Sequence, residues 1–159
     1  MTNKVQLKNL AKESLTPMMN RHGYELVNGF DYLKEGPNDI YYMISSTISY
    51  SEHLKLFVGC YIDEMDELTS LAFPKHLPEM FGGGLTDEYP IQPTKWKIWQ
   101  VGTESEAIES LKQIESSIQK YAFPFFDSIQ SKEDLLATLP RVPTKGPWVP
   151  VINKIKSKI

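Results

Sequence analysis

One stretch of sequence decides the fold: LKLFVGCYI, residues 54–62. Apolar residues at every second position alternate with Lys55, Phe57, Gly59 and Tyr61, which is the two-residue period of a β-strand. The apolar set is Leu54, Leu56, Val58, Cys60 and Ile62. We expect this set to face the core and the residues between them to face away from it.

The residues before this strand predict an antiparallel partner for it. A turn signal at residues 36–39, Gly-Pro-Asn-Asp, separates two extended runs at 29–35 and 40–50, so we expect a hairpin there. The second run places Tyr42 and Ile44 on one face and Tyr41 and Met43 on the other. Together the runs predict an antiparallel meander with one aliphatic face and one mixed polar and aromatic face.

Helices are predicted on both sides of the meander. Apolar residues recur at three- and four-residue steps over 3–22, where Pro17 either kinks the helix or starts a second one capped by Thr16. Capping boxes, in which a side chain and the third helical residue satisfy each other's free amides, are indicated at residues 103–106 and 131–134. The first opens a helix that Pro124 ends or bends.

The connection between the meander and the C-terminal helices is irregular. Four acidic residues between 63 and 67 predict a short helix with an acidic first turn. Residues 73–95 hold four prolines and the triplet Gly82–Gly84, which predicts a long flexible loop. Residues 95–101 then read as a further strand.

These elements predict an α+β fold: a mainly antiparallel four-stranded sheet with an N-terminal helix and C-terminal helices packed on it. We expect residues 1–140 to form one α+β domain and residues 141–159 a loosely held C-terminal tail. A chain of 159 residues is long enough for one such core.

The composition of the chain disfavours some classes of binding partner. The net charge of −3 lacks the basic surplus that phosphate backbones require, which disfavours nucleic acid. No apolar run is long enough for a membrane helix, and the N-terminus has no signal-peptide pattern, so we expect no membrane association and a cytoplasmic location. Cys60 is the only cysteine, which rules out an internal disulfide.

The order of motifs resembles a known bacterial family. A helix ends in His22-Gly23-Tyr24, an alternating strand ends in Val58-Gly59-Cys60-Tyr61-Ile62, and a capped helix runs into Phe123-Pro124-Phe125-Phe126-Asp127. Over residues 5–140 this pattern resembles the DUF4304-like domain of unknown function. The resemblance implies an α+β fold in a bacterial cytoplasm, and no activity or catalytic residue comes with it.

Individual motifs predict neither a metal nor a cofactor. Acidic residues follow the glycine triplet, where a phosphate loop needs a lysine and a hydroxyl residue. His22, His53 and His76 have no second ligand at a metal-binding step. Cys60 lies in the core-facing set, which predicts a buried and inert thiol.

The aromatic residues predict a binding surface. Tyr41, Phe57 and Tyr61 should share the face opposite the aliphatic core, and Trp96 or Trp99 could join them. Such residues could line a groove beneath the 73–95 loop that holds a peptide or a small ligand. Ordinary packing under the C-terminal helices is the competing interpretation.

We therefore expect a non-enzymatic, cytoplasmic binding or protein-interaction module, with an immunity or accessory protein as the nearest analogy. The alternative is a small enzyme whose site assembles only in the fold, around His53, His76, Asp63 and Tyr61. An enzyme requires titratable groups that converge in a pocket, whereas an interaction module requires an exposed apolar or aromatic surface.

Overall fold

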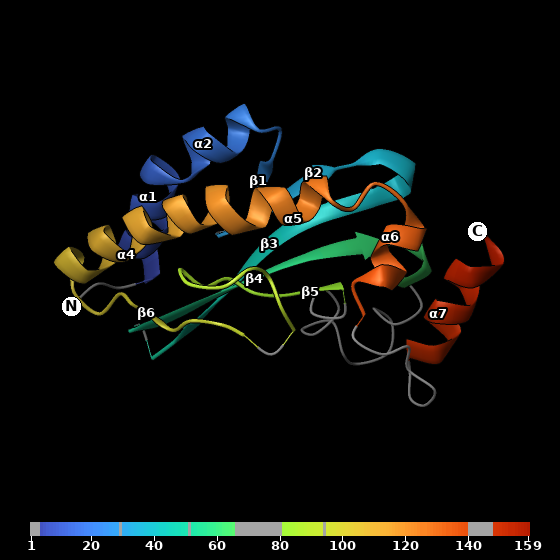
Figure 1. Ribbon diagram of the computed structural model, residues 1–159. Coiled ribbons are helices and arrows are strands. Elements are labelled where there is room, and N and C mark those ends of the chain that lie inside the picture. Colours follow the sequence, from blue (N-terminus) through green and yellow to red (C-terminus); the bar gives the residue numbers. More distant parts are fainter. Residues whose placement is uncertain (1–3, 29, 51, 66–80, 94, 140–147) are drawn as a thin grey trace.

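The computed structural model describes residues 4–28, 30–50, 52–65, 81–93, 95–139 and 148–159 (Figure 1). The strands are β1 (Glu25–Asn28), β2 (Asp31–Glu35), β3 (Ile40–Ser49), β4 (His53–Ile62), β5 (Gly82–Gly84) and β6 (Trp99–Gln100). The α-helices are α1 (Lys4–Ser14), α2 (Thr16–Arg21), α4 (Glu104–Ser117), α5 (Phe123–Asp127), α6 (Lys132–Ala137) and α7 (Trp148–Ser157). Two 3-10 turns, η1 (Pro37–Asp39) and η2 (Asp63–Met65), and a π-helical turn, η5 (Ile118–Ala122), complete the described elements.

The strands form one antiparallel sheet in the order β1-β2-β3-β4-β5, and β6 pairs with β4 beside β5. This confirms the α+β class and the antiparallel meander. The sheet has six strands in place of the predicted four, because β1 and the short strand β5 also pair into it, while β6 falls within the strand predicted at residues 95–101. The β3–β4 hairpin is its longest ladder, with an unbroken register from Ile40 opposite Ile62 to Ser49 opposite His53.

Burial along β4 follows the predicted alternation. Leu54, Leu56, Val58, Cys60 and Ile62 are all completely buried. The residues between them, Lys55, Phe57 and Tyr61, are half-buried. Each buried aliphatic side chain contributes about 1.5–3 kcal/mol relative to an exposed one, so the core side of β4 fixes the hairpin register.

Helices cover the aliphatic face of the sheet. Figure 1 shows α1, α2, α4 and α5 lying together on one side of it. A break after Ser14 separates α1 from α2, and Pro17 lies in the first turn of α2, so a second helix starts there as predicted, although Leu15 and not Thr16 is its N-cap. Both predicted capping boxes, at Thr103 with Glu106 and at Ser131 with Asp134, are present.

Helical backbone continues past Pro124, so the proline does not end its helix. The π-helical turn η5 joins α4 to α5, and Pro124 lies in the first turn of α5, where a missing backbone N–H costs least. Phe126 on α5 then packs against the ring of Tyr42 at 4.9 Å between centroids. The Tyr42 hydroxyl donates to the Ile129 carbonyl at 2.5 Å, which ties β3 to the segment after α5.

The glycine triplet corrects one prediction. Gly82–Gly84 form β5 inside the sheet, so they are not part of a flexible loop. A side chain is excluded at each position, because a Cβ atom at Gly82 would lie 1.9 Å from the Val58 carbonyl oxygen and one at Gly84 would lie 2.2 Å from the Trp96 Cβ. The triplet lets neighbouring backbone approach the sheet closely.

Two other predictions in this region need adjustment. Of residues 95–101, only Trp99–Gln100 pair as a strand. The acidic run after β4 begins with the 3-10 turn η2, and the rest of the predicted short helix lies outside the described residues.

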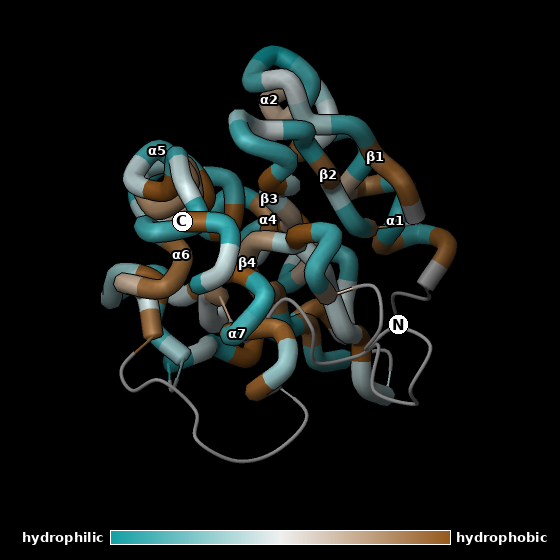
Figure 2. Tube along the Cα trace, turned by 90° about the vertical axis from the view of Figure 1, so that its right-hand side faces the viewer, coloured by the Kyte–Doolittle hydropathy of each residue, from teal (hydrophilic) through white to brown (hydrophobic). Residues whose placement is uncertain are grey.

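Of the predicted loose tail at residues 141–159, residues 141–147 lie outside the described residues, and the remainder is not loose. Residues 148–157 form α7, in which Val151, Ile152 and Ile155 are buried. Figure 1 places α6 and α7 at one end of the sheet, and Figure 2 views the molecule from that end. Among the described helices, none is both long enough and apolar enough to span a bilayer.

Candidate functional site

The three predicted sheet aromatics lie on the face opposite the aliphatic core. Tyr41 pairs across the β3–β4 ladder with Tyr61, and Phe57 pairs with Ser45 on one side and Gly84 on the other. All three side chains are half-buried, so the helices do not enclose them completely. The structure therefore places Tyr41, Phe57 and Tyr61 together on one face, as expected.

The two predicted tryptophans lie on opposite faces. Trp96 joins the mixed face, because its Cβ occupies the space that a side chain at Gly84, the cross-strand neighbour of Phe57, would take. Trp99 does not join it. It pairs with Leu54, is 1% exposed and belongs to the core. The sequence could not separate the two, since residues 95–98 make no regular strand whose alternation could be counted.

Three exposed apolar side chains lie between β5 and β6. Tyr89, Trp96 and Ile98, which we call the aromatic surface, are 44%, 51% and 45% exposed. An open hollow of about 450 Å³ lies among them, lined by residues 86–89 and 95–98. Neither Phe57 nor the two sheet tyrosines belong to this lining. The hollow is thus beside the predicted face, built mainly from the loop itself.

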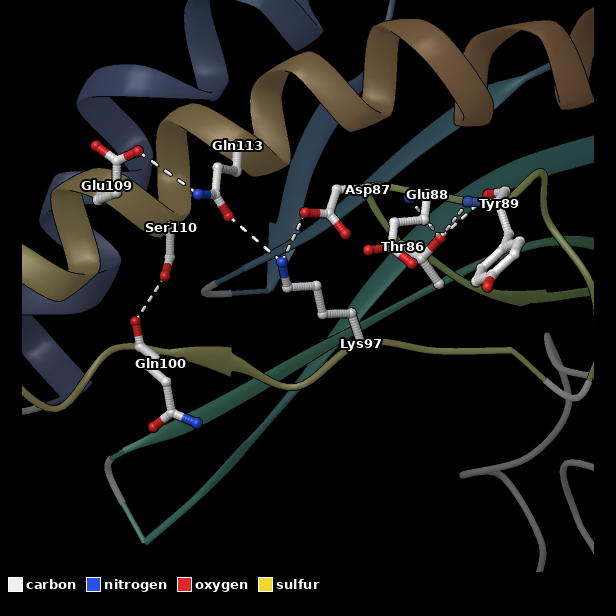
Figure 3. A network of polar contacts seen from close by, with 9 residues as sticks. All are labelled: Thr86, Asp87, Glu88, Tyr89, Lys97, Gln100, Glu109, Ser110 and Gln113. Atoms are coloured by element: carbon white, nitrogen blue, oxygen red, sulfur yellow. Dashed lines mark hydrogen bonds and ion pairs between the residues drawn. The ribbon is translucent and has the colours of Figure 1, made fainter.

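Polar contacts hold the loop that carries the aromatic surface (Figure 3). The Thr86 hydroxyl accepts hydrogen bonds from the backbone N–H groups of Glu88 and Tyr89 at 3.2 and 2.8 Å, which closes a tight turn. Lys97 Nζ lies 2.7 Å from Asp87 Oδ2 and donates to Gln113 on α4. These contacts fix both sides of the hollow relative to α4.

Two further lysines lie over the exposed rings. Lys95 Nζ is 4.8 Å from the ring centre of Tyr89, and Lys55 Nζ, which comes from β4, is 5.5 Å from the ring of Trp96. Such cation–π contacts contribute about 0.5–1 kcal/mol each at exposed sites. The aromatic surface is therefore flanked by positive charge from two separate elements.

The alternative catalytic set does not assemble from the described residues. His53 starts β4 and Asp63 follows its end, so roughly 30 Å of extended strand separates them. Tyr61 lies near Asp63, and His76 lies outside the described residues. His53 therefore cannot share a pocket with Asp63 and Tyr61. Within the described part of the chain, no three histidine, cysteine or acidic side chains gather as metal ligands.

The buried titratable groups on the core side are unsuited to acid–base chemistry. Burial raises the pKa of the Cys60 thiol, so the thiolate required for nucleophilic attack is disfavoured. Burial, followed by the charges of Cys60 and Asp127, raises the pKa of Tyr42 to about 12. Both groups remain neutral near pH 7 and pack as core residues.

A buried carboxylate lies at the far end of β4. Glu64 in η2 is 4% exposed, and its Oε1 accepts from Lys132 at 2.6 Å and from Lys158 at 2.5 Å. Burial raises the pKa of Glu64, but the two ammonium groups outweigh it and lower the pKa overall. The contacts join η2, α6 and the end of α7, which gives this cluster a structural role.

The sequence did not identify Tyr89, Ile98, Lys55 or Lys95 as site residues. Of these four, only Lys55 could have been identified from the sequence, because the strand alternation places it on the outward face of β4 with Phe57. The other three lie on irregular backbone after β5, where no periodicity reports which side chains are exposed.

Comparison with family models, with curated proteins and with solved structures found no match to the chain. The resemblance to the DUF4304-like family therefore stays a prediction.

Proposed function

We propose that the protein is a binding module that uses its aromatic surface to recognise another protein. One observation carries this proposal: three large apolar side chains, Tyr89, Trp96 and Ile98, are about half exposed around one hollow. A contiguous exposed apolar surface with a polar rim is typical of a protein contact site.

The rigidity of the loop supports the proposal. Trp96 rests against Gly84 of the sheet, and Lys97 is tied to Asp87. A loop whose backbone is already held in place loses less conformational freedom on binding, so more of its contact energy appears as affinity. Tryptophan and tyrosine are also enriched among residues that dominate binding energy.

The test is affinity capture with the wild-type protein and with Trp96→Ser, using extracts of the native cell and quantitative mass spectrometry. A specific partner should be recovered with wild type and depleted with Trp96→Ser. Loss of a central tryptophan costs about 2 kcal/mol or more, which corresponds to roughly 30-fold weaker binding.

The matched control is Val5→Ser on α1, which removes a side chain that is 67% exposed but lies on another element. Val5→Ser should recover the partner as wild type does. The proposal is wrong if no captured protein depends on Trp96, or if Val5→Ser depletes the same protein equally.

A further inference from the structure

The two lysines over the aromatic surface differ from the lysine behind it. Lys97 forms an ion pair with Asp87. No carboxylate of the described residues forms an ion pair with Lys55 or Lys95, whose ammonium groups lie over the rings of Trp96 and Tyr89. No carboxylate in the described part of the chain therefore competes with a ligand for either ammonium group.

The distribution of charge around the aromatic surface favours a ligand of negative charge. Asp87 is neutralised by Lys97 on the side that faces α4 (Figure 3). Glu88 is the one remaining carboxylate in the described lining of the hollow, against Lys95 in that lining and Lys55 over the ring of Trp96. An ammonium group over a ring face also repels any cationic side chain that approaches the same ring.

We propose that the aromatic surface binds an acidic peptide segment of a partner protein, with its carboxylates on Lys55 and Lys95 and an apolar side chain against Trp96 and Tyr89. This inference rests on the proposed function and specifies the chemistry of the partner. Charge complementarity of this kind selects among partners more than it raises affinity.

A peptide is favoured over a nucleic acid by the number of cations. Binding to a phosphate backbone draws most of its free energy from several basic contacts. Here, among the described residues, only Lys55 and Lys95 lie over the rings of the aromatic surface, and Glu88 in the lining of the hollow would repel a phosphate. A peptide needs only a few carboxylates, and it supplies the apolar side chain that the rings can bury.

The experiment measures binding of four labelled polymers by fluorescence anisotropy: a Glu–Tyr copolymer, polyglutamate, a Lys–Tyr copolymer and oligothymidylate. We expect the Glu–Tyr copolymer to bind most tightly, polyglutamate more weakly because it lacks an apolar side chain, and the Lys–Tyr copolymer not at all. Added salt should weaken the binding of both acidic polymers, since exposed charges are screened.

Charge variants locate the contact. Lys55→Gln and Lys95→Gln should each weaken binding of the Glu–Tyr copolymer about two- to fivefold, the range for an exposed ion pair. Glu88→Gln should strengthen it because a repulsive charge is removed. Lys112→Gln, an exposed lysine on α4, is the matched control and should bind as wild type does.

The outcomes separate this inference from the proposed function. If the Glu–Tyr copolymer does not bind, or if Lys55→Gln and Lys95→Gln bind it as wild type does, the acidic-peptide inference is wrong. A partner that still depends on Trp96 in the capture experiment would then leave the proposed function intact. Tighter binding of oligothymidylate through the same lysines would overturn the inference in favour of nucleic acid.

Discussion

The β3–β4 hairpin and the segment that follows it toward α4 are stabilised in different ways. We call residues 81–93 and 95–101 the outer segment. The hairpin has ten paired residues on each strand and a row of completely buried side chains. The outer segment has five strand residues in β5 and β6, and its backbone packs where three glycines leave room. Both regions bury apolar side chains, including Phe81 and Trp99 of the outer segment, but only the outer segment also depends on positions without a side chain.

This difference would explain why the proposed binding surface lies in the outer segment, with Lys55 of β4 beside it. A strand with one face in the core has its register fixed by burial. The directions of its outward side chains are then set by the strand alternation. Irregular backbone that is held by a few polar contacts can present side chains in directions that no regular strand allows. Tyr89, Trp96 and Ile98 are such side chains, and none has a regular strand partner.

The largest loss of stability is expected from a substitution in the core of the β3–β4 hairpin. Leu56→Ala removes a completely buried side chain and should lower the free energy of unfolding by about 2–5 kcal/mol. Thr47→Ala, on the exposed face of β3, should change it by less than about 0.5 kcal/mol. Urea unfolding followed by circular dichroism measures both. Equal losses would show that the two faces do not differ as the burial pattern indicates.

The next effect tests the glycine packing of the outer segment. Gly84→Ala places a Cβ 2.2 Å from the Trp96 Cβ and 2.4 Å from the Lys95 carbonyl oxygen, so the backbone must move. We expect a loss of about 1–3 kcal/mol, the usual cost of overpacking, and a change in iodide quenching of tryptophan fluorescence.

The control for that substitution is Gly102→Ala. Its Cβ would meet nothing closer than the Glu52 Cγ at 3.4 Å, which is ordinary contact. Gly102→Ala should leave stability and quenching close to wild type. A wild-type quenching profile in Gly84→Ala would contradict the claim that β5 positions Trp96.

A smaller effect compares the ionic contacts of the two regions, beginning with Glu64 at the end of β4. Glu64→Gln removes the charge that Lys132 and Lys158 share and should cost about 1–2 kcal/mol at pH 7, given the partial exposure of both lysines. Because the folded pKa of Glu64 is lowered, its contribution is complete above the usual pKa of 4.5 and is lost as the pH falls through the folded pKa. The difference between wild type and Glu64→Gln should therefore shrink below about pH 4.5.

The control for this pH dependence is Glu133→Gln, an exposed residue on α6. It should follow the wild-type stability curve from pH 7 to pH 3. If the gap between wild type and Glu64→Gln stays constant over this range, another group must supply the stabilising charge.

The sequence predicted the structure correctly where burial imposes a periodic pattern of apolar residues. It failed where the structure depends on the close approach of backbone segments that are distant in sequence. Alternation identified the buried face of β4, including Cys60, and capping chemistry located the starts of α4 and α6. The glycine triplet was predicted as loop because its partners, Val58 and Trp96, are distant in sequence and leave no local signal. The face of Trp96 depends on that same contact and the face of Trp99 on its pairing with Leu54, so the candidate site could be predicted only in part.

The smallest effect belongs to the exposed ion pair of the outer segment. Lys97 and Asp87 have side chains that are 34% and 35% exposed, and pairs of this kind contribute about 0–1 kcal/mol. Lys97→Gln, Asp87→Asn and the double variant form a cycle whose coupling free energy, measured by urea unfolding, should lie in that range and fall further in high salt. A coupling above about 2 kcal/mol would mean that this contact, rather than the packing of backbone against Gly84, holds the aromatic surface in place. A small coupling, together with a large effect of Gly84→Ala, would instead show that the outer segment owes its shape to the absence of side chains in β5.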